Sequence, residues 1–111
     1  MFINIEGLSK LQKIKFMDYI LEVIDKTERE IRLTKEHFKH IIYHKGMENY
    51  IEEIKETLRN PLKIVPHETG DLHDYYNYYK DRKEKAKYLQ VVVKYLNNHG
   101  FILTAYFVKH I

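Results

Sequence analysis

The spacing of apolar residues changes between the two prolines of the chain, Pro61 and Pro66. Before Pro61, apolar side chains fall on one stripe of a helix at about 100° per residue. Asn60-Pro61 ends that helix, because a proline disfavours the helical conformation in the residue before it. After Pro66, apolar and polar residues alternate as they do in β-strands. The members of the helical stripe are Met47, Tyr50, Ile51, Ile54 and Leu58.

The residues after Pro61 predict strands over 63–65, 72–80, 88–95 and 101–108. The β-branched run within 88–95 predicts burial on both faces, and therefore a central position in the sheet. Residues 97–100 have the composition of a turn, so 101–108 returns as the antiparallel partner of 88–95. We expect an α+β fold in which two or three N-terminal helices pack on one face of a C-terminal antiparallel sheet of about four strands.

The first third of the chain fits more than one pattern. Apolar residues from Leu8 to Ile24 follow helical spacing, but those of residues 19–23 also alternate as in a strand. We expect a short helix near 9–15, followed by a hairpin of about 17–25 and 29–33. Thr34 is a suitable N-cap for the next helix, and Gly46 is a natural stop for it.

Composition restricts the classes of protein to which the chain can belong. Its 111 residues predict one domain over 1–111. The absence of cysteine excludes disulfides and thiolate chemistry. Neither a membrane-spanning apolar run nor a secretory signal is recognisable, so we expect a cytoplasmic location and no membrane partner. The net charge is +3, and five of residues 80–87 are Lys or Arg. That basic run follows a tyrosine-rich segment, which fits either a nucleic-acid surface or a solvated hairpin loop.

Three histidines lie in the segment that follows Thr34. On a helix, His37, His40 and His44 would fall within about 60° of one another, along the border of the apolar face. Imidazole can both accept and donate a proton near neutral pH, so this stripe is a candidate for acid–base chemistry. Two other interpretations stay open. His40 and His44 have the spacing of metal ligands, although no His-Glu-x-x-His motif is present, and the histidines could simply border the core.

Residues of the last two predicted strands form a second candidate cluster. Thr104 and Tyr106 share one face of their strand, whereas Leu103, Ala105 and Phe107 take the other. Lys94 lies within a run of valines, and it must reach solvent or a partner because an unpaired buried ammonium is costly. Thr104 is equally compatible with an ordinary strand threonine.

Two stretches of the chain resemble a known superfamily. Residues 31–61 run from Ile31-Arg32-Leu33-Thr34 through the histidine helix to Leu58-Arg59-Asn60-Pro61. They resemble the strand, Leu-Thr, histidine helix and Asn-Pro ending of the barnase–EndoU–colicin–RelE nucleases, in the phage and prokaryotic toxin-type branch. The strands 88–94 and 100–106 resemble the closing hairpin of that group. The His-Pro-Glu-like turn of the family is absent here, where His44-Lys45-Gly46 stands and the acid is displaced to Glu48.

The resemblance implies a toxin-like ribonuclease that needs no metal or other cofactor. A base would deprotonate the ribose 2′-hydroxyl, which attacks the adjacent phosphorus. Carried onto this chain, His44 or His40 would act as base or acid, Lys94 would supply charge at the phosphate, and Thr104 would hydrogen-bond to it. The implied partners are RNA, as tRNA or messenger RNA, and an antitoxin or immunity protein.

Placement in the sheet, rather than a motif, makes Tyr79, Arg82 and Tyr106 candidate substrate contacts. Two alternatives remain beside the ribonuclease. One is a non-catalytic module that binds RNA or protein on the same surface. The other is a metal-dependent hydrolase built on the three histidines.

Overall fold

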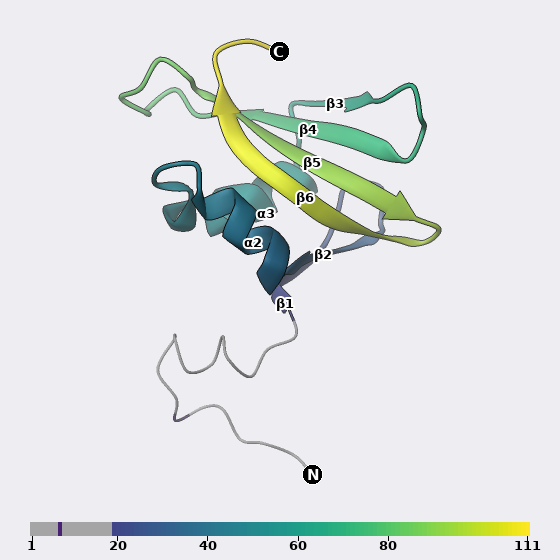
Figure 1. Cartoon of the computed structure of the whole chain (residues 1–111). Helices are drawn as coiled ribbons and strands as arrows, with labels where there is room; N and C mark the ends of the chain where they lie inside the picture. Colours follow the sequence, from purple (N-terminus) through teal and green to yellow (C-terminus); the bar gives the residue numbers. More distant parts are fainter. Residues whose placement is uncertain (1–6, 8–18) are drawn as a thin grey trace.

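The computed structural model describes Gly7 and residues 19–111 of the chain. Within these residues a sheet of six strands carries the helices on one side (Figure 1). Its strands lie in the order β1-β2-β6-β5-β4-β3. The elements in chain order are β1 (Tyr19–Ile24), β2 (Glu30–Thr34), α2 (Lys35–Ile42), a 3₁₀ turn η1 (Met47–Asn49), α3 (Ile51–Arg59), β3 (Lys63–Pro66), β4 (Leu72–Tyr78), β5 (Tyr88–Leu96) and β6 (His99–Val108).

The α+β class is right, but the expected arrangement of helices and strands is wrong. The sheet has six strands rather than about four, and the helices of the described residues follow a β-hairpin instead of preceding all the strands. That hairpin, β1–β2, lies close to the predicted 17–25 and 29–33. The prediction failed because β2 joins the sheet through β6, and local sequence patterns carry no signal for so distant a pairing. The helix expected near 9–15 lies outside the described residues.

The junction of β2 and β6 is a parallel pair that depends on a glycine. Ile31 lies opposite Gly100, while the remaining neighbours in the sheet are antiparallel. A Cβ atom at Gly100 would stand 2.9 Å from the Lys94 carbonyl oxygen and 2.9 Å from Ile31 Cδ1. Gly100 therefore leaves room both for the backbone of β5 and for the Ile31 side chain of β2. The turn was expected over 97–100, but it comprises only residues 97–98, because β5 ends at Leu96 and β6 begins at His99. Asn97 in this turn has a positive φ of 62°.

The core lies between the helices and one face of the sheet. Alternate residues of β5, among them Leu89, Val91 and Val93, are fully buried together with Ile54 and Leu58 of α3. The expectation that β5 is buried on both faces is therefore wrong, because its other residues are half-buried or exposed. Its central position, between β6 and β4, is confirmed.

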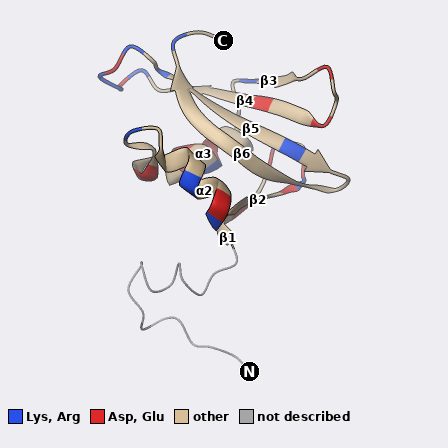
Figure 2. Cartoon of the chain, viewed as in Figure 1, with Lys and Arg blue, Asp and Glu red and all other residues tan. Residues whose placement is uncertain are grey.

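We call the face of the sheet opposite this core the outer face. Residues directly opposite each other in adjacent strands project to the same face, so the register assigns its members. They are Asp74, Tyr76 and Tyr78 of β4, Tyr88, Gln90, Val92 and Lys94 of β5, and Thr104, Tyr106 and Val108 of β6. In Figure 2 the acidic band of β4 is Asp74 and the basic band of β5 is Lys94, the only Asp, Glu, Lys or Arg of those two strands.

A buried carboxylate fastens the β1–β2 turn to the centre of the sheet. Asp25 accepts hydrogen bonds from the hydroxyls of Tyr75 (2.7 Å) and Tyr95 (2.5 Å) through Oδ2. Its Oδ1 accepts the Thr27 hydroxyl and the amides of Thr27 and Arg29. Burial works to raise the pKa of Asp25, but the hydrogen bonds from Tyr95, Tyr75 and Thr27 outweigh it and hold this pKa below its usual range. Burial and the bond to Asp25 raise the pKa of Tyr95 to about 12.

Among the described residues, no helix combines the length and the apolar character that crossing a membrane requires.

Candidate active site

His44 lies beyond the end of the helix that was expected to carry it. Thr34 caps α2 as predicted, accepting the His37 amide at 3.1 Å, but the helix ends at Ile42. The His44 amide donates to the Ile41 carbonyl at 3.0 Å, and the His44 carbonyl accepts from Met47. Gly46 completes this turn with a φ of 82°, a conformation that residues with a Cβ rarely adopt. His44 therefore belongs to a turn that follows α2, whereas His37 and His40 lie within the helix.

The His44 ring packs against Tyr106 of β6. Their ring centroids are 5.2 Å apart and the planes are inclined by 36°. His44 is exposed, whereas Tyr106 is half-buried on the outer face, in register with Gln90 of β5 and Tyr76 of β4. Tyr106, Gln90 and Tyr76 thus form a row of polar side chains across three strands, and the His44 imidazole contacts the first of them.

Thr104 and Lys94 lie on the same outer face. Thr104 is opposite Val92, and Lys94 is opposite Phe101. A register shift between Val92 and Val93 accommodates one additional residue in β6, and beyond it Thr104 and Tyr106 face outward while Ala105 is fully buried. Lys94 is exposed, in agreement with the expectation that its ammonium must reach solvent or a partner. The structure thus places Thr104, Tyr106 and Lys94 on one face of the sheet, with His44 against Tyr106. Lys94 is four residues along β5 from Gln90, the partner of Tyr106, which is about 13 Å.

Three further polar residues of this region were not predicted. Asp74, only 8% exposed, lies 2.9 Å through Oδ2 from Nε2 of His67, and among the described residues its Oδ1 has no hydrogen-bond partner. Burial, followed by the charges of Asp74 and Tyr106, raises the pKa of Tyr76. Strand alternation could have placed Asp74 and Tyr76 on one face. It could not have placed His67, because that side chain reaches Asp74 from a loop.

The Asp74–His67 pair is too distant from His44 to share a reacting atom with it. Asp74 is on β4 and Tyr106 is on β6, so two strand spacings, about 10 Å, separate their backbones. We therefore do not expect Asp74 or His67 to transfer a proton at the site where His44 contacts Tyr106.

Tyr79 and Arg82 lie on the helix side of the sheet. The Tyr79 hydroxyl donates to Glu56 Oε1 at 2.9 Å, and the Arg82 guanidinium lies 3.6 Å from the centroid of the Phe107 ring. Burial and the bond to Glu56 raise the pKa of Tyr79 to about 12. Arg82 also donates to the Ala86 carbonyl at 2.9 Å, which holds the 79–87 loop in shape. A role for either residue in substrate binding stays a prediction.

The other two histidines remain on α2. His37 Nδ1 is 3.1 Å from the Thr34 hydroxyl, and the ring centroids of His37 and His40 are 6.4 Å apart. His40 is exposed. Glu48, the expected substitute for the acid of the family turn, is exposed in η1. Within residues 19–111, no three histidine or carboxylate side chains converge as a set of metal ligands.

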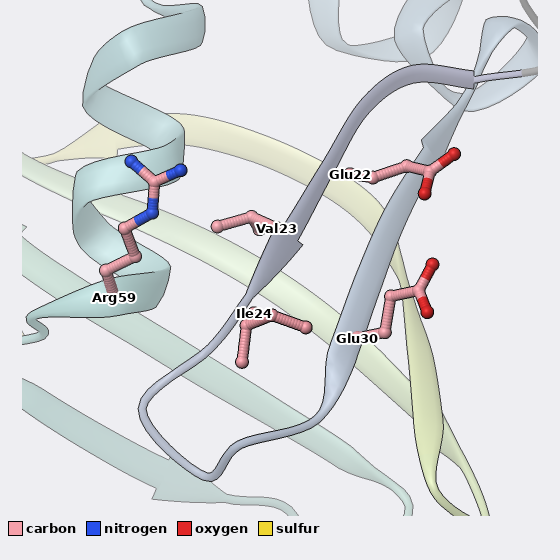
Figure 3. A pocket seen from close by; sticks show the side chains of 5 residues that line it. All are labelled: Glu22, Val23, Ile24, Glu30 and Arg59. Atoms are coloured by element: carbon pink, nitrogen blue, oxygen red, sulfur yellow. The ribbon is translucent and has the colours of Figure 1, made fainter.

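A surface pocket at the far end of the sheet does not resemble a reaction site. It is lined by Glu22, Val23, Ile24, Glu30 and Arg59. Figure 3 shows Arg59, on α3, on the opposite side of β1 from the two carboxylates. Those carboxylates approach Arg32 instead, at 4.0 Å for Glu22 and 2.8 Å for Glu30. Glu22 and Glu30 are therefore compensated by Arg32, and Arg59 lies apart from them.

Comparison with known proteins gives one match. The family described as phage-Barnase-EndoU-ColicinE5/D-RelE like nuclease 2 matches residues 9–109. No curated protein and no solved structure matches the chain.

Proposed function

The chain belongs to this family of phage nucleases, and from that premise we propose that it is a metal-independent endoribonuclease with its active site where His44 meets the outer face. The observation that carries the proposal is the packing of His44 against Tyr106, with Thr104 two residues away on the same face. An exposed imidazole, a hydroxyl and an ammonium are the groups that acid–base cleavage of a phosphodiester requires.

In the proposed reaction His44 removes the proton of the ribose 2′-hydroxyl. The 2′ oxygen then forms a bond to the adjacent phosphorus, and the bond from phosphorus to the 5′ oxygen breaks. The 5′ oxygen leaves as a hydroxyl after taking a proton from water, so the products carry 2′,3′-cyclic phosphate and 5′-hydroxyl ends. Thr104 donates a hydrogen bond to the phosphorane, and Lys94, the diagonal neighbour of Thr104 across β5 and β6, supplies positive charge to the bound phosphate.

His40 is the second candidate for the base. It is exposed on α2, and its ring contacts are with His37 and Tyr43, at centroid distances of 6.4 and 6.5 Å. His44 is favoured because its ring touches a residue of the outer face. Comparing variants of the two histidines decides between them.

The proposal extends to a biological role. A ribonuclease of this family would act as a toxin on tRNA or messenger RNA in the cytoplasm, and the producing cell would need an antitoxin or immunity protein. Occlusion of the His44–Tyr106 corner by that partner would be sufficient to block the reaction.

The test is cleavage of total RNA by the purified protein in excess chelator. We expect wild type to leave 2′,3′-cyclic phosphate ends, and His44→Ala and Thr104→Ala to lose activity by a factor of about 10² or more while remaining folded. His99→Ala is the matched control, since His99 lies at the other end of β6 and contacts Phe101. Full activity in His44→Ala with loss in His40→Ala would move the base to α2.

Cleavage that appears only after a divalent metal is restored would favour the metal-dependent hydrolase. Folded protein that cleaves no RNA under either condition would favour a non-catalytic binding module.

A further inference from the structure

Two tyrosines form an aromatic pair at the end of the outer face nearest the 79–87 loop. Tyr78 of β4 lies directly opposite Tyr88 of β5. Their ring centroids are 4.9 Å apart, with the planes inclined by 50°. Tyr78, the last residue of β4, is 47% exposed, which is a large fraction for an aromatic side chain. The pair therefore presents ring surface to solvent.

This Tyr78–Tyr88 pair adjoins the proposed reaction site. Tyr88 is opposite Val108, and the next outward residues, Gln90 and Tyr106, are opposite each other. Tyr88 and Tyr106 are thus diagonal neighbours across β5 and β6, about 7–8 Å apart. A nucleotide next to the phosphodiester held at His44 and Tyr106 would place its base over the Tyr78–Tyr88 pair.

The loop that follows Tyr78 adds positive charge next to the pair in the sequence. Lys80, Lys83 and Lys85 are exposed, with Asp81 and Glu84 between them. Glu84 approaches Arg82 at 3.6 Å, and the Lys87 ammonium donates to the carbonyls of Lys80 and Arg82. These internal contacts hold the loop in shape and leave three ammonium groups at its surface. Lysines next to a stacking surface are the combination by which proteins bind single-stranded nucleic acid.

We propose that the Tyr78–Tyr88 pair is a subsite for one unpaired base next to the cleaved phosphodiester, with the loop lysines binding the adjoining phosphates. The substrate is then single-stranded RNA. A base within a duplex has both faces covered by its neighbours, so it cannot stack on this pair without leaving the helix. The inference rests on the proposed function for the position of the cleaved bond, whereas the binding it describes does not require catalysis.

The test uses a fluorescently labelled RNA strand with 2′-O-methyl groups throughout, because blocking the 2′ oxygen prevents cleavage and leaves binding measurable. Wild type is titrated with this strand alone and with the strand annealed to its complement. We expect tighter binding of the single strand. We expect Tyr78→Leu and Tyr88→Leu each to weaken it by about 5- to 100-fold, the range for loss of one base–aromatic contact. Tyr78→Phe and Tyr88→Phe keep the ring and should bind as wild type does.

Tyr19→Leu is the matched aromatic control, because Tyr19 lies on the edge strand β1 in contact with Arg32. Equal binding of strand and duplex, wild-type affinity in both leucine variants, or no binding by wild type would each overturn the subsite. Cleavage of the unmodified strand is measured in parallel. Normal binding without cleavage refutes the ribonuclease alone, and cleavage with leucine variants that bind normally refutes the subsite alone.

Discussion

Replacement of Asp25 by alanine should lower the free energy of unfolding by about 4 kcal/mol. The carboxylate accepts five hydrogen bonds, and four of its donor groups belong to Thr27, Tyr75 and Tyr95. Without it the two tyrosine hydroxyls can still bond to each other, but one buried hydroxyl hydrogen is left without an acceptor, at a cost of about 1–3 kcal/mol. The turn amides lose a charged acceptor that water replaces only in part, which adds about 1–2 kcal/mol.

The assay is urea unfolding followed by circular dichroism. With a slope of about 2 kcal/mol per molar urea, the midpoint of Asp25→Ala should fall by about 2 M. Tyr95→Phe removes one donor and keeps the carboxylate, so it should cost about 1–2 kcal/mol. Asp81→Ala, which removes an exposed carboxylate from the 79–87 loop, should change stability by less than about 0.5 kcal/mol.

The same network predicts the sign of the pH dependence. The folded pKa of Asp25 lies below its ordinary value of 3.8, so the stabilisation is complete above that pH and is lost as the pH falls through the folded value. When the pH is lowered from 5 to below the folded pKa of Asp25, the free energy of unfolding should therefore fall less in the Asp25→Ala variant than in wild type. A cost below about 1 kcal/mol, or an acid dependence identical to that of wild type, would refute the account of Asp25 as a buried, ionised anchor.

Three further substitutions test other parts of the structure. Gly100→Ala should destabilise the protein by about 2–3 kcal/mol in the same urea assay, because its Cβ would meet the Lys94 carbonyl at 2.9 Å; a neutral effect would contradict the close approach of the β5 backbone to Gly100. Gly46→Ala should cost only about 1 kcal/mol, since open space surrounds the Cβ position, yet it should reduce kcat more than stability by disturbing the turn that positions His44. Lys94→Ala should weaken RNA binding and lower the slope of log affinity against log salt by about 1, and an unchanged slope would remove Lys94 from the phosphate site.

Features encoded by neighbouring residues could be predicted from the sequence. Thr34 was recognisable as an N-cap because its hydroxyl needs only the amide of His37, three residues away. The alternation of Thr104 and Tyr106 with Ala105 follows from strand geometry, and so does their placement on the outer face once the register is known. In the same way, Asn60-Pro61 marks the end of α3 to within one residue.

Features that depend on distant residues could not be predicted. Nothing near Ile31 indicates that its strand pairs with Gly100. Asp25 had the appearance of a polar turn residue, and only the fold shows that two hydroxyls from β4 and β5 meet its carboxylate. His44 continues the helical spacing of His37 and His40, but α2 ends before it. The contact of His44 with Tyr106 of β6 is likewise between residues far apart in the sequence.

The parallel pairing of β2 with β6 also sets the order in which the protein can assemble. Closing a loop of about seventy residues carries a larger entropy cost than forming the hairpins on either side, so the pairing of Ile31 with Gly100 belongs to the slow steps of folding. During synthesis the β1–β2 hairpin must wait for β6 to leave the ribosome before it joins the sheet. His44 meets Tyr106 only then, so a growing chain carries no complete active site until β6 has emerged.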